Sequence, residues 1–133
     1  MFGAFDISAS AMTAQRMRFE TIQSNIANID SVGGPDGKNV PYRRLMTIFE
    51  AQGQDGMPGG VRVREIAEDP RAFQIRHEPW NPYHDAEGNV KYPNVDLFEE
   101  NVNALDSSRA YEANVTAIET TKSMMNATLR LIA

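Results

Sequence analysis

The sequence predicts an α+β protein in which long N- and C-terminal helices pair as an antiparallel coiled coil around a small β-rich insertion. Apolar residues recur at seven-residue spacing near both ends, which is typical of helices that pack along a seam. Between them, glycines and prolines interrupt short stretches of alternating polarity. At 133 residues the chain can form one modest core. We expect a terminal helical coiled-coil domain of residues 1–30 plus 95–133, and an outer domain of residues 31–94 made of loops and strands.

The first long helix is predicted over about residues 5–29. The apolar residues of its seam are Phe5, Met12, Phe19 and Ile26, and Ile22 joins them at an offset of three. The segment from Asp30 to Pro35 contains two glycines and a proline, which end a helix by left-handed caps and a missing amide donor.

The second helix is predicted to begin after Asp96 and to run to the end of the sequence. Asp96 and Glu99 form a plausible capping box, and Pro93 prevents the helix from extending backwards. Its seam is longer than the first and contains Leu97, Ala104, Tyr111, Ile118, Met125 and Ile132, with Val115 and Leu129 beside them.

The middle of the chain is predicted to form two or three β-hairpins. Residues 61–64 and 73–76 alternate with period two, and residues 42–49 contain several β-favouring side chains. Turn-forming sequences separate them, around Gly53–Gly60, at Asp69–Pro70 and at Glu87–Asn89.

Composition excludes several classes of function. The net charge of −5 and the lack of a basic stripe argue against nucleic-acid binding. The absence of cysteine excludes disulfides, thiolate metal sites and cysteine nucleophiles. No stretch is long and apolar enough to span a membrane directly, and the N-terminus does not resemble a secretory signal. A cytoplasmic protein is the default expectation, unless export uses no cleaved signal.

Candidate chemical motifs are weak, and we expect no catalytic, cofactor-binding or metal-binding residues and no enzymatic activity. The segment Gly33–Asn39 resembles a phosphate-binding loop, but Val32 replaces its first glycine and Asn39 replaces its hydroxyl residue. His77 lies near His84, Asp85 and Glu87, but without a known metal-ligand spacing and in ordinary turn composition.

Seven-residue seams require a partner along their whole length. The seams either close on each other within one chain or also pack against other subunits. A peripheral membrane or scaffold protein with amphipathic ends is the alternative, although its helices should have a basic polar face and the second helix begins with acids. A metal-dependent enzyme is a third class. Trp80 either anchors the insertion on its own helices or contacts a neighbouring subunit.

The segment Ser24–Asn28 reads Ser-Asn-Ile-Ala-Asn and resembles a motif of the axial proteins of the bacterial flagellum. Within that family, the longer loop from Asp30 to Tyr42 resembles the basal-body rod proteins of the proximal-rod type. Similar blocks recur at Lys91–Asp96, Ser108–Val115 and Lys122–Met125. The residues that match the family motifs are Ser24, Asn25, Ala27, Asn28, Pro93, Asn94, Arg109, Tyr111 and Asn114.

The resemblance implies a structural subunit that assembles helically with other proximal and distal rod proteins, transmits torque and lines an export conduit. Further partners implied are the rod-base adaptor at the membrane ring and the flagellar type III export apparatus, with no nucleic acid. The implied location is the periplasm-spanning rod of the basal body, reached without a cleaved signal. The resemblance implies no cofactor.

Overall fold

The computed structural model describes residues 2–53 and 59–133. Two long helices bracket four short strands, as the α+β expectation requires. The elements in chain order are α1 (Phe2–Ala27), β1 (Leu45–Ala51), β2 (Val61–Glu68), β3 (Gln74–His77), β4 (Asn89–Tyr92) and α2 (Leu97–Ile132).

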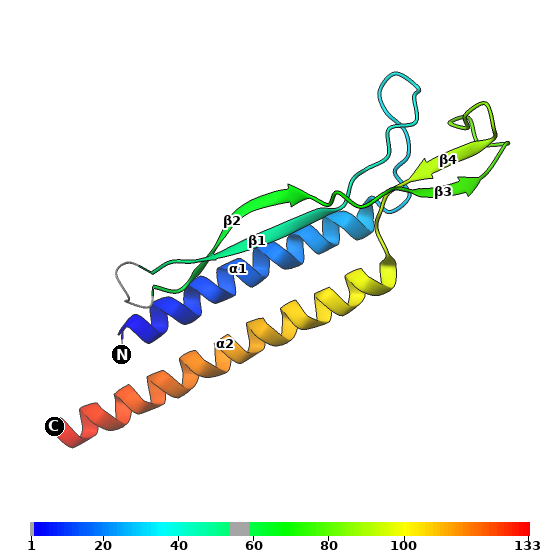
Figure 1. The fold of residues 1–133 in the computed structure, drawn as a ribbon. Helices are drawn as coiled ribbons and strands as arrows, with labels where there is room; N and C mark the ends of the chain where they lie inside the picture. The colour runs from blue at the N-terminus through cyan, green and yellow to red at the C-terminus, as the bar shows by residue number, and fades with distance from the viewer. Residues whose placement is uncertain (1, 54–58) are drawn as a thin grey trace.

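The helices α1 and α2 lie side by side and run in opposite directions (Figure 1), so the predicted antiparallel pairing is confirmed. Ala14 and Ser107 are buried between them, and the Ser107 hydroxyl donates a hydrogen bond to the Gln15 carbonyl oxygen over 2.8 Å. Arg18 donates to the Asn103 side chain at 3.3 Å. Small side chains at the contact allow the two backbones to approach closely.

The two helices differ in length, with 26 residues in α1 and 36 in α2. They are aligned at the end near the strands, so the C-terminal turns of α2 extend past the N-terminus of α1 (Figure 1). Because Ser107 lies against Gln15 and the helices are antiparallel, Phe2 at the start of α1 lies about level with residue 120 of α2, and we call residues 121–132 of α2 the overhang. Its Leu129, Leu131 and Ile132 are 60%, 88% and 78% exposed.

The helix boundaries follow local hydrogen bonds. α1 ends at Ala27, two residues before the predicted end. The Asn28 amide still donates to the Ser24 carbonyl at 3.1 Å, but the Ile29 amide donates to the Ile26 carbonyl, only three residues back, at 3.3 Å. Asp96 caps α2 as predicted, because it accepts hydrogen bonds from the backbone amides of Phe98 at 2.8 Å and Glu99 at 3.4 Å. The Glu99 side chain, which a capping box would direct to the Asp96 amide, instead pairs with Arg71 and Arg44.

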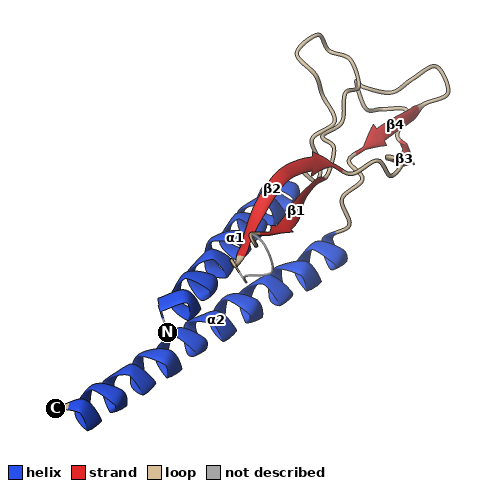
Figure 2. Cartoon of the chain, turned by 60° about the vertical axis from the view of Figure 1, so that its left-hand side comes forward, coloured by secondary structure: helices blue, strands red, loops and turns tan. Residues whose placement is uncertain are grey.

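The first hairpin pairs β1 with β2 in antiparallel register, from Leu45 opposite Glu68 to Ala51 opposite Val61, with a bulge between Ile48 and Phe49. It lies along α1 (Figures 1 and 2). At its far end the Val61 amide donates to the Ser10 hydroxyl over 3.1 Å. The turn predicted around Gly53–Gly60 lies partly outside the described residues.

The second hairpin pairs β3 with β4 beyond the C-terminal end of α1. Together with residues 31–40 it forms a region that we call the head, whose small core consists of Val32, Val90 and Tyr92. The strand β4 was not predicted. Within the described residues there are therefore two hairpins, of which only one packs along a helix. The division at residues 31–94 remains a prediction.

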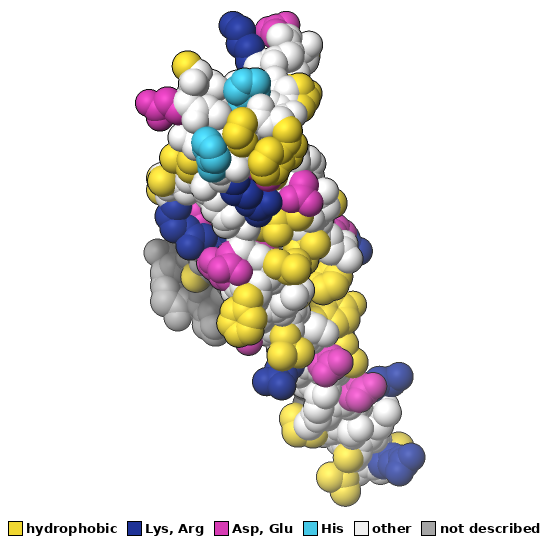
Figure 3. Space-filling view, turned by 90° about the vertical axis from the view of Figure 1, so that its right-hand side faces the viewer, with side chains coloured by type: hydrophobic (Ala, Val, Ile, Leu, Met, Phe, Trp, Pro, Cys, Tyr) yellow, Lys and Arg dark blue, Asp and Glu magenta, His cyan; other side chains and the backbone are white. Residues whose placement is uncertain are grey.

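The position of Trp80 excludes one of the two roles expected for it. Its side chain is 79% exposed on the head, so it does not anchor the insertion on the chain's own helices. A space-filling view shows hydrophobic side chains at intervals from the head towards the C-terminus (Figure 3).

Candidate functional site

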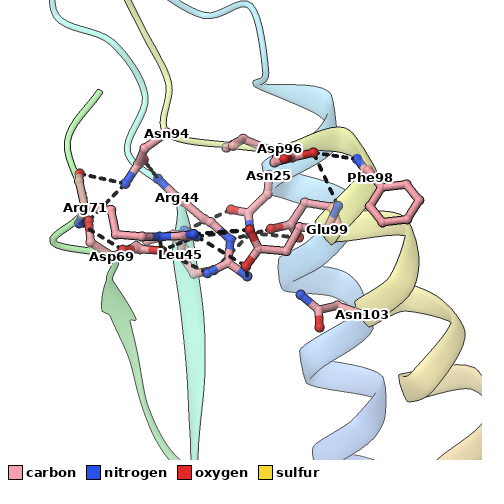
Figure 4. Close-up of polar contacts among 12 residues, drawn as sticks. Asn25, Arg44, Leu45, Asp69, Arg71, Asn94, Asp96, Phe98, Glu99 and Asn103 are labelled. Carbon is pink, nitrogen blue, oxygen red and sulfur yellow. Dashed lines mark hydrogen bonds and ion pairs between the residues drawn. The ribbon is translucent and has the colours of Figure 1, made fainter. Parts of the chain in front are cut away.

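The most densely bonded site is a buried polar cluster at the place where both helices meet the two hairpins (Figure 4). It consists of Asn25 at the end of α1, Arg44 before β1, Asp69 after β2, Asn94 before α2 and Glu100 in the first turns of α2. All five side chains are buried, and those of Asn25 and Glu100 are fully enclosed. We call these five residues the clasp, because they join segments that are distant in the sequence.

Asn25 attaches α1 to the edge of β1. Its side-chain oxygen accepts from the Leu45 amide at 2.9 Å, and its side-chain nitrogen donates to the Leu45 carbonyl at 2.9 Å. The Asn25 side chain thus replaces a neighbouring strand at that position. The Tyr42 hydroxyl donates to the Asn25 oxygen at 2.9 Å, and the Asn25 nitrogen also reaches Glu100 at 3.4 Å.

Arg44 is the cation at the centre of the clasp. Its Nε donates to Glu100 Oε1, and its Nη1 lies 3.0 Å from Asp69 Oδ2. Glu99 lies 3.7 Å away from Nη2. A carboxylate as deeply buried as that of Glu100 is tolerated only beside such a partner, because removing an isolated charge from water is costly.

Asn94 holds the segment before α2 against β1 and β2. Its oxygen accepts from the Arg44 amide at 2.8 Å, and its nitrogen donates to the carbonyls of Asp69 at 3.2 Å and Arg71 at 3.1 Å. Arg71 then extends the ion pairs outward, at 2.8 Å from Asp69 and 3.2 Å from Glu99. The loop before α2 is therefore bonded to the segments that directly precede β1 and follow β2.

The ion pairs shift two pKa values in the clasp. Hydrogen bonds from the Arg71 side chain, together with Arg44, lower the pKa of Asp69 to about 2, although burial opposes the shift. Burial alone would lower the pKa of Arg44, but its hydrogen bonds with Glu100 and Asp69 and the nearby acids raise it. Asp69 is thus ionised and Arg44 is protonated at neutral pH.

The lowered pKa of Asp69 predicts a loss of stability in acid. The carboxyl group stabilises the fold fully above its unfolded pKa of 3.8, and this contribution is lost as the pH falls through about 2. We expect the free energy of unfolding to drop by about 1–2 kcal/mol from this group, since Arg71 is half exposed and screened by water. Urea titrations at several pH values measure the effect.

The control for this acid effect compares two variants. Asp69→Asn should remove this part of the pH dependence, whereas Asp106→Asn, which removes an exposed acid on α2, should retain it. An unchanged acid slope in Asp69→Asn would contradict the assignment.

The family-motif residues fall into two groups. Asn25, Pro93 and Asn94 are buried at or beside the clasp, while Ser24 and Asn28 border it at the end of α1, with the Ser24 hydroxyl 3.3 Å from that of Tyr42. Ala27 is exposed. Arg109, Tyr111 and Asn114 lie further along α2 and take no part in the clasp, and the Asn114 side chain donates to the Ala110 carbonyl of its own helix.

The predicted seam residues are buried to different degrees. Ile22 is the only one of them that is buried, at 4% exposure, although Ala14 and Ser107 are also buried between the two helices. The half-buried members are Phe5, Met12, Ile26, Val115, Ile118 and Met125. The exposed members are Phe19, Leu97, Tyr111, Leu129 and Ile132. Their packing against neighbouring subunits remains a prediction.

An apolar groove of about 680 Å³ runs between α1 and α2. Phe19, Tyr111 and Val115 line it together with Gln15. The Gln15 side-chain oxygen is buried and has no hydrogen-bond partner within the described residues. A buried acceptor without a donor is unusual in a folded protein.

Sequence reasoning missed Arg44, Asp69 and the burial of Glu100. Glu100 is one of the acids at the start of the second helix, but it is enclosed and paired with Arg44. Across the described residues, no group of three or more His, Cys, Asp or Glu side chains could hold a metal ion. None of the helices described is both long and apolar enough to cross a bilayer.

A long helical pair, with a small β insertion fastened to it by buried ion pairs, is an architecture that suits a structural subunit. Comparison with known proteins agrees. The model described as "Flagella basal body rod protein" matches residues 5–35, and that described as "Flagellar basal body rod FlgEFG protein C-terminal" matches residues 86–131.

Relatives that match along almost their whole length identify the family more specifically. The chain is 46% identical to the flagellar basal-body rod protein FlgC of Yersinia enterocolitica, over 98% of this chain and 97% of the relative. It is 39% identical to FlgC of Bacillus subtilis with the same coverage, and 42% identical to FlgC of Aquifex aeolicus over 96% and 94% of the two chains. The chain belongs to the FlgC family of flagellar basal-body rod proteins. These names give no support to the alternative of a peripheral membrane or scaffold protein.

Proposed function

We propose that this chain is a structural subunit of the proximal rod, without enzymatic activity, that assembles helically with other rod proteins through its terminal helices. The observation on which the proposal depends is the overhang. Met125, Leu129 and Ile132 continue the face of α2 that packs on α1, but α1 ends before it reaches them. An apolar helix face of this kind gains stability only when another helix covers it.

The groove beside α1 supports the same proposal. Its apolar lining and the unpaired Gln15 oxygen suit a helix that supplies apolar side chains and one hydrogen-bond donor. The clasp then holds the head and the first hairpin in fixed positions on the helical pair. A subunit that transmits torque needs such a rigid junction, because relative motion between its parts would absorb the rotation.

The further parts of the proposal concern the route and the neighbours. We propose that the flagellar type III apparatus exports the chain without cleavage of a signal, and that it lies in the periplasm-spanning rod. Its neighbours there are other proximal and distal rod proteins and the rod-base adaptor at the membrane ring, and the assembled subunits line the export conduit.

The test is a double substitution in the overhang. Leu129→Asp with Ile132→Asp is expected to abolish incorporation into basal bodies and motility, because carboxylates cannot pack in an apolar helical interface. The purified variant should keep its helix content by circular dichroism, because both side chains are already exposed in the single chain.

The matched control for the overhang test is Ser123→Asp. Ser123 lies on the opposite side of the same helix by its 100° spacing and is exposed, so its variant should incorporate normally. Normal motility in the double variant would contradict the proposed role of the overhang.

A further inference from the structure

The two edges of the β3–β4 hairpin are not equivalent. The Glu78 amide donates to the Gly88 carbonyl at 2.9 Å, which sets the alternation of hydrogen bonds along the ladder. The pairs that exchange ladder bonds are then Arg76 with Val90 and Gln74 with Tyr92. The residues between them direct their N–H and C=O groups away from the partner strand.

Side chains close the outer edge of β4. The Lys91 amide donates to the Asn39 side-chain oxygen at 2.8 Å, and the Asn39 nitrogen donates to the Lys91 carbonyl at 3.0 Å. The Asn89 amide donates to the Asp85 carboxylate at 2.9 Å, and the Asp85 amide donates to the Asn89 carbonyl at 2.9 Å. All four outward peptide groups of β4 are thus satisfied.

The outer edge of β3 is open. The N–H and C=O groups of Ile75 and His77 point outward, and within residues 2–53 and 59–133 they have no hydrogen-bond partner. All residues of β3 are exposed, Ile75 by 65%, and β3 contacts no described helix or strand except β4. Figure 3 shows both histidines of the chain on the surface of the head. An open strand edge is a template for another strand.

A second open edge lies on β2. The Asp69 amide donates to the Arg44 carbonyl at 2.8 Å, so by alternation the peptide groups of Ile66 point away from its partner Thr47. Those groups also lack a partner within the part of the chain that the structure describes. The Ile66 side chain is 48% exposed.

We propose that β3 of one copy pairs antiparallel with β2 of a neighbouring copy, with Ile75 opposite Ile66. This inference rests on the proposed function, which brings copies of the chain side by side in the rod. In this register Glu65 lies opposite Arg76 of the neighbour, which is a favourable cross-strand pair.

One register in which β3 could pair with its own copy is disfavoured. A two-fold antiparallel pair that hydrogen-bonds Ile75 to His77 places Arg76 opposite Arg76, and like charges directly opposite are destabilising. Contact between two different strands can also be heterologous, and a heterologous contact that does not close after two copies extends into a helical array.

The chain contains no cysteine, so introduced cysteines report this contact without background. Hydrogen-bonded antiparallel residues lie about 5.5 Å apart between Cα atoms, within the range of disulfide bonds. We would produce Ile66→Cys and Ile75→Cys chains together in the bacterium that encodes the protein, isolate basal bodies and oxidise them. A disulfide-linked dimer is expected when both variants are present, and none with either alone.

Three results would overturn the inference. Dimers from Ile75→Cys alone or Ile66→Cys alone would indicate self-pairing of β3 or of β2. A dimer yield no higher than that of Ile66→Cys with Glu87→Cys, an exposed site on the head, would exclude the contact. A low dimer yield overturns the inference only if both variants are found in the basal bodies. Their absence from basal bodies would instead contradict the proposed function.

A proline substitution tests the hydrogen bonds of the edge. The His77 amide is not used in the ladder, so His77→Pro should leave the β3–β4 pairing intact while removing one outward donor. Added to Ile75→Cys, it should reduce cross-linking with Ile66→Cys to the control level. His77→Ala keeps the amide, so when it is added to Ile75→Cys it should not reduce the cross-linking with Ile66→Cys. Equal yields from the two variants would show that β3 does not bond through this edge.

Discussion

Arg44→Met is expected to destabilise the chain by about 3–5 kcal/mol, because it leaves the enclosed Glu100 carboxylate without its cation. Single domains are stable by only about 5–15 kcal/mol, so this loss is a large fraction of the total and should lower the unfolding midpoint clearly. The measurement is urea unfolding followed by circular dichroism, with the midpoint and slope fitted separately.

Two further variants separate the ion pair from a general effect of lost charge. Arg62→Met removes a pair with Glu50 in which the two side chains are 58% and 39% exposed, and should cost less than about 1 kcal/mol. Arg44→Met combined with Glu100→Met should recover part of the lost stability, since both buried charges are then removed together. An Arg44→Met variant as stable as Arg62→Met would show that Glu100 is not held by Arg44.

Asn25→Ala is expected to cost about 2–3 kcal/mol, because it leaves both peptide groups of Leu45 without partners and removes a donor from Glu100. The first hairpin should detach from α1 near Leu45. Hydrogen exchange of the Leu45 amide should accelerate more than that of amides in the middle of α2.

Asn28→Ala is the matched control for Asn25→Ala. The two asparagines belong to the same five-residue motif, but the Asn28 side chain bonds only near the end of α1, to the Ser24 carbonyl and from the Ser31 hydroxyl. Its loss should cost less than about 1 kcal/mol. Equal destabilisation by the two substitutions would argue against a special role of Asn25.

Local patterns predicted the helices well. Seven-residue spacing and the cap at Asp96 depend on neighbours within one or two turns, and α2 begins after Asp96 as expected. The strand β4 has only four residues and follows a turn sequence, so its pairing with β3 was not visible. The exposure of Trp80 likewise depends on how the head is placed, which no local pattern determines.

The clasp could be predicted only in part. The family motifs indicated Asn25 and Asn94, but not that both bond to the backbone beside Arg44. Arg44, Asp69 and Glu100 belong to separate segments, and nothing in their immediate surroundings distinguishes them from surface charges. Their partners were unknown because burial of a charge depends on tertiary contacts between residues 25 and 75 positions apart.

The spread of the clasp along the chain determines when it can close. Glu100 follows Arg44 by 56 positions, so any process that delivers the polypeptide N-terminus first presents Arg44 long before its counter-ion arrives. Until Glu100 arrives, the Arg44 guanidinium remains hydrated, and the part of the chain already delivered lacks the ion pair that closes the clasp. Contacts between such distant positions form late and slowly. A chain delivered in this way stays flexible, and the junction between its helices and its first hairpin becomes rigid only when the final third has been delivered.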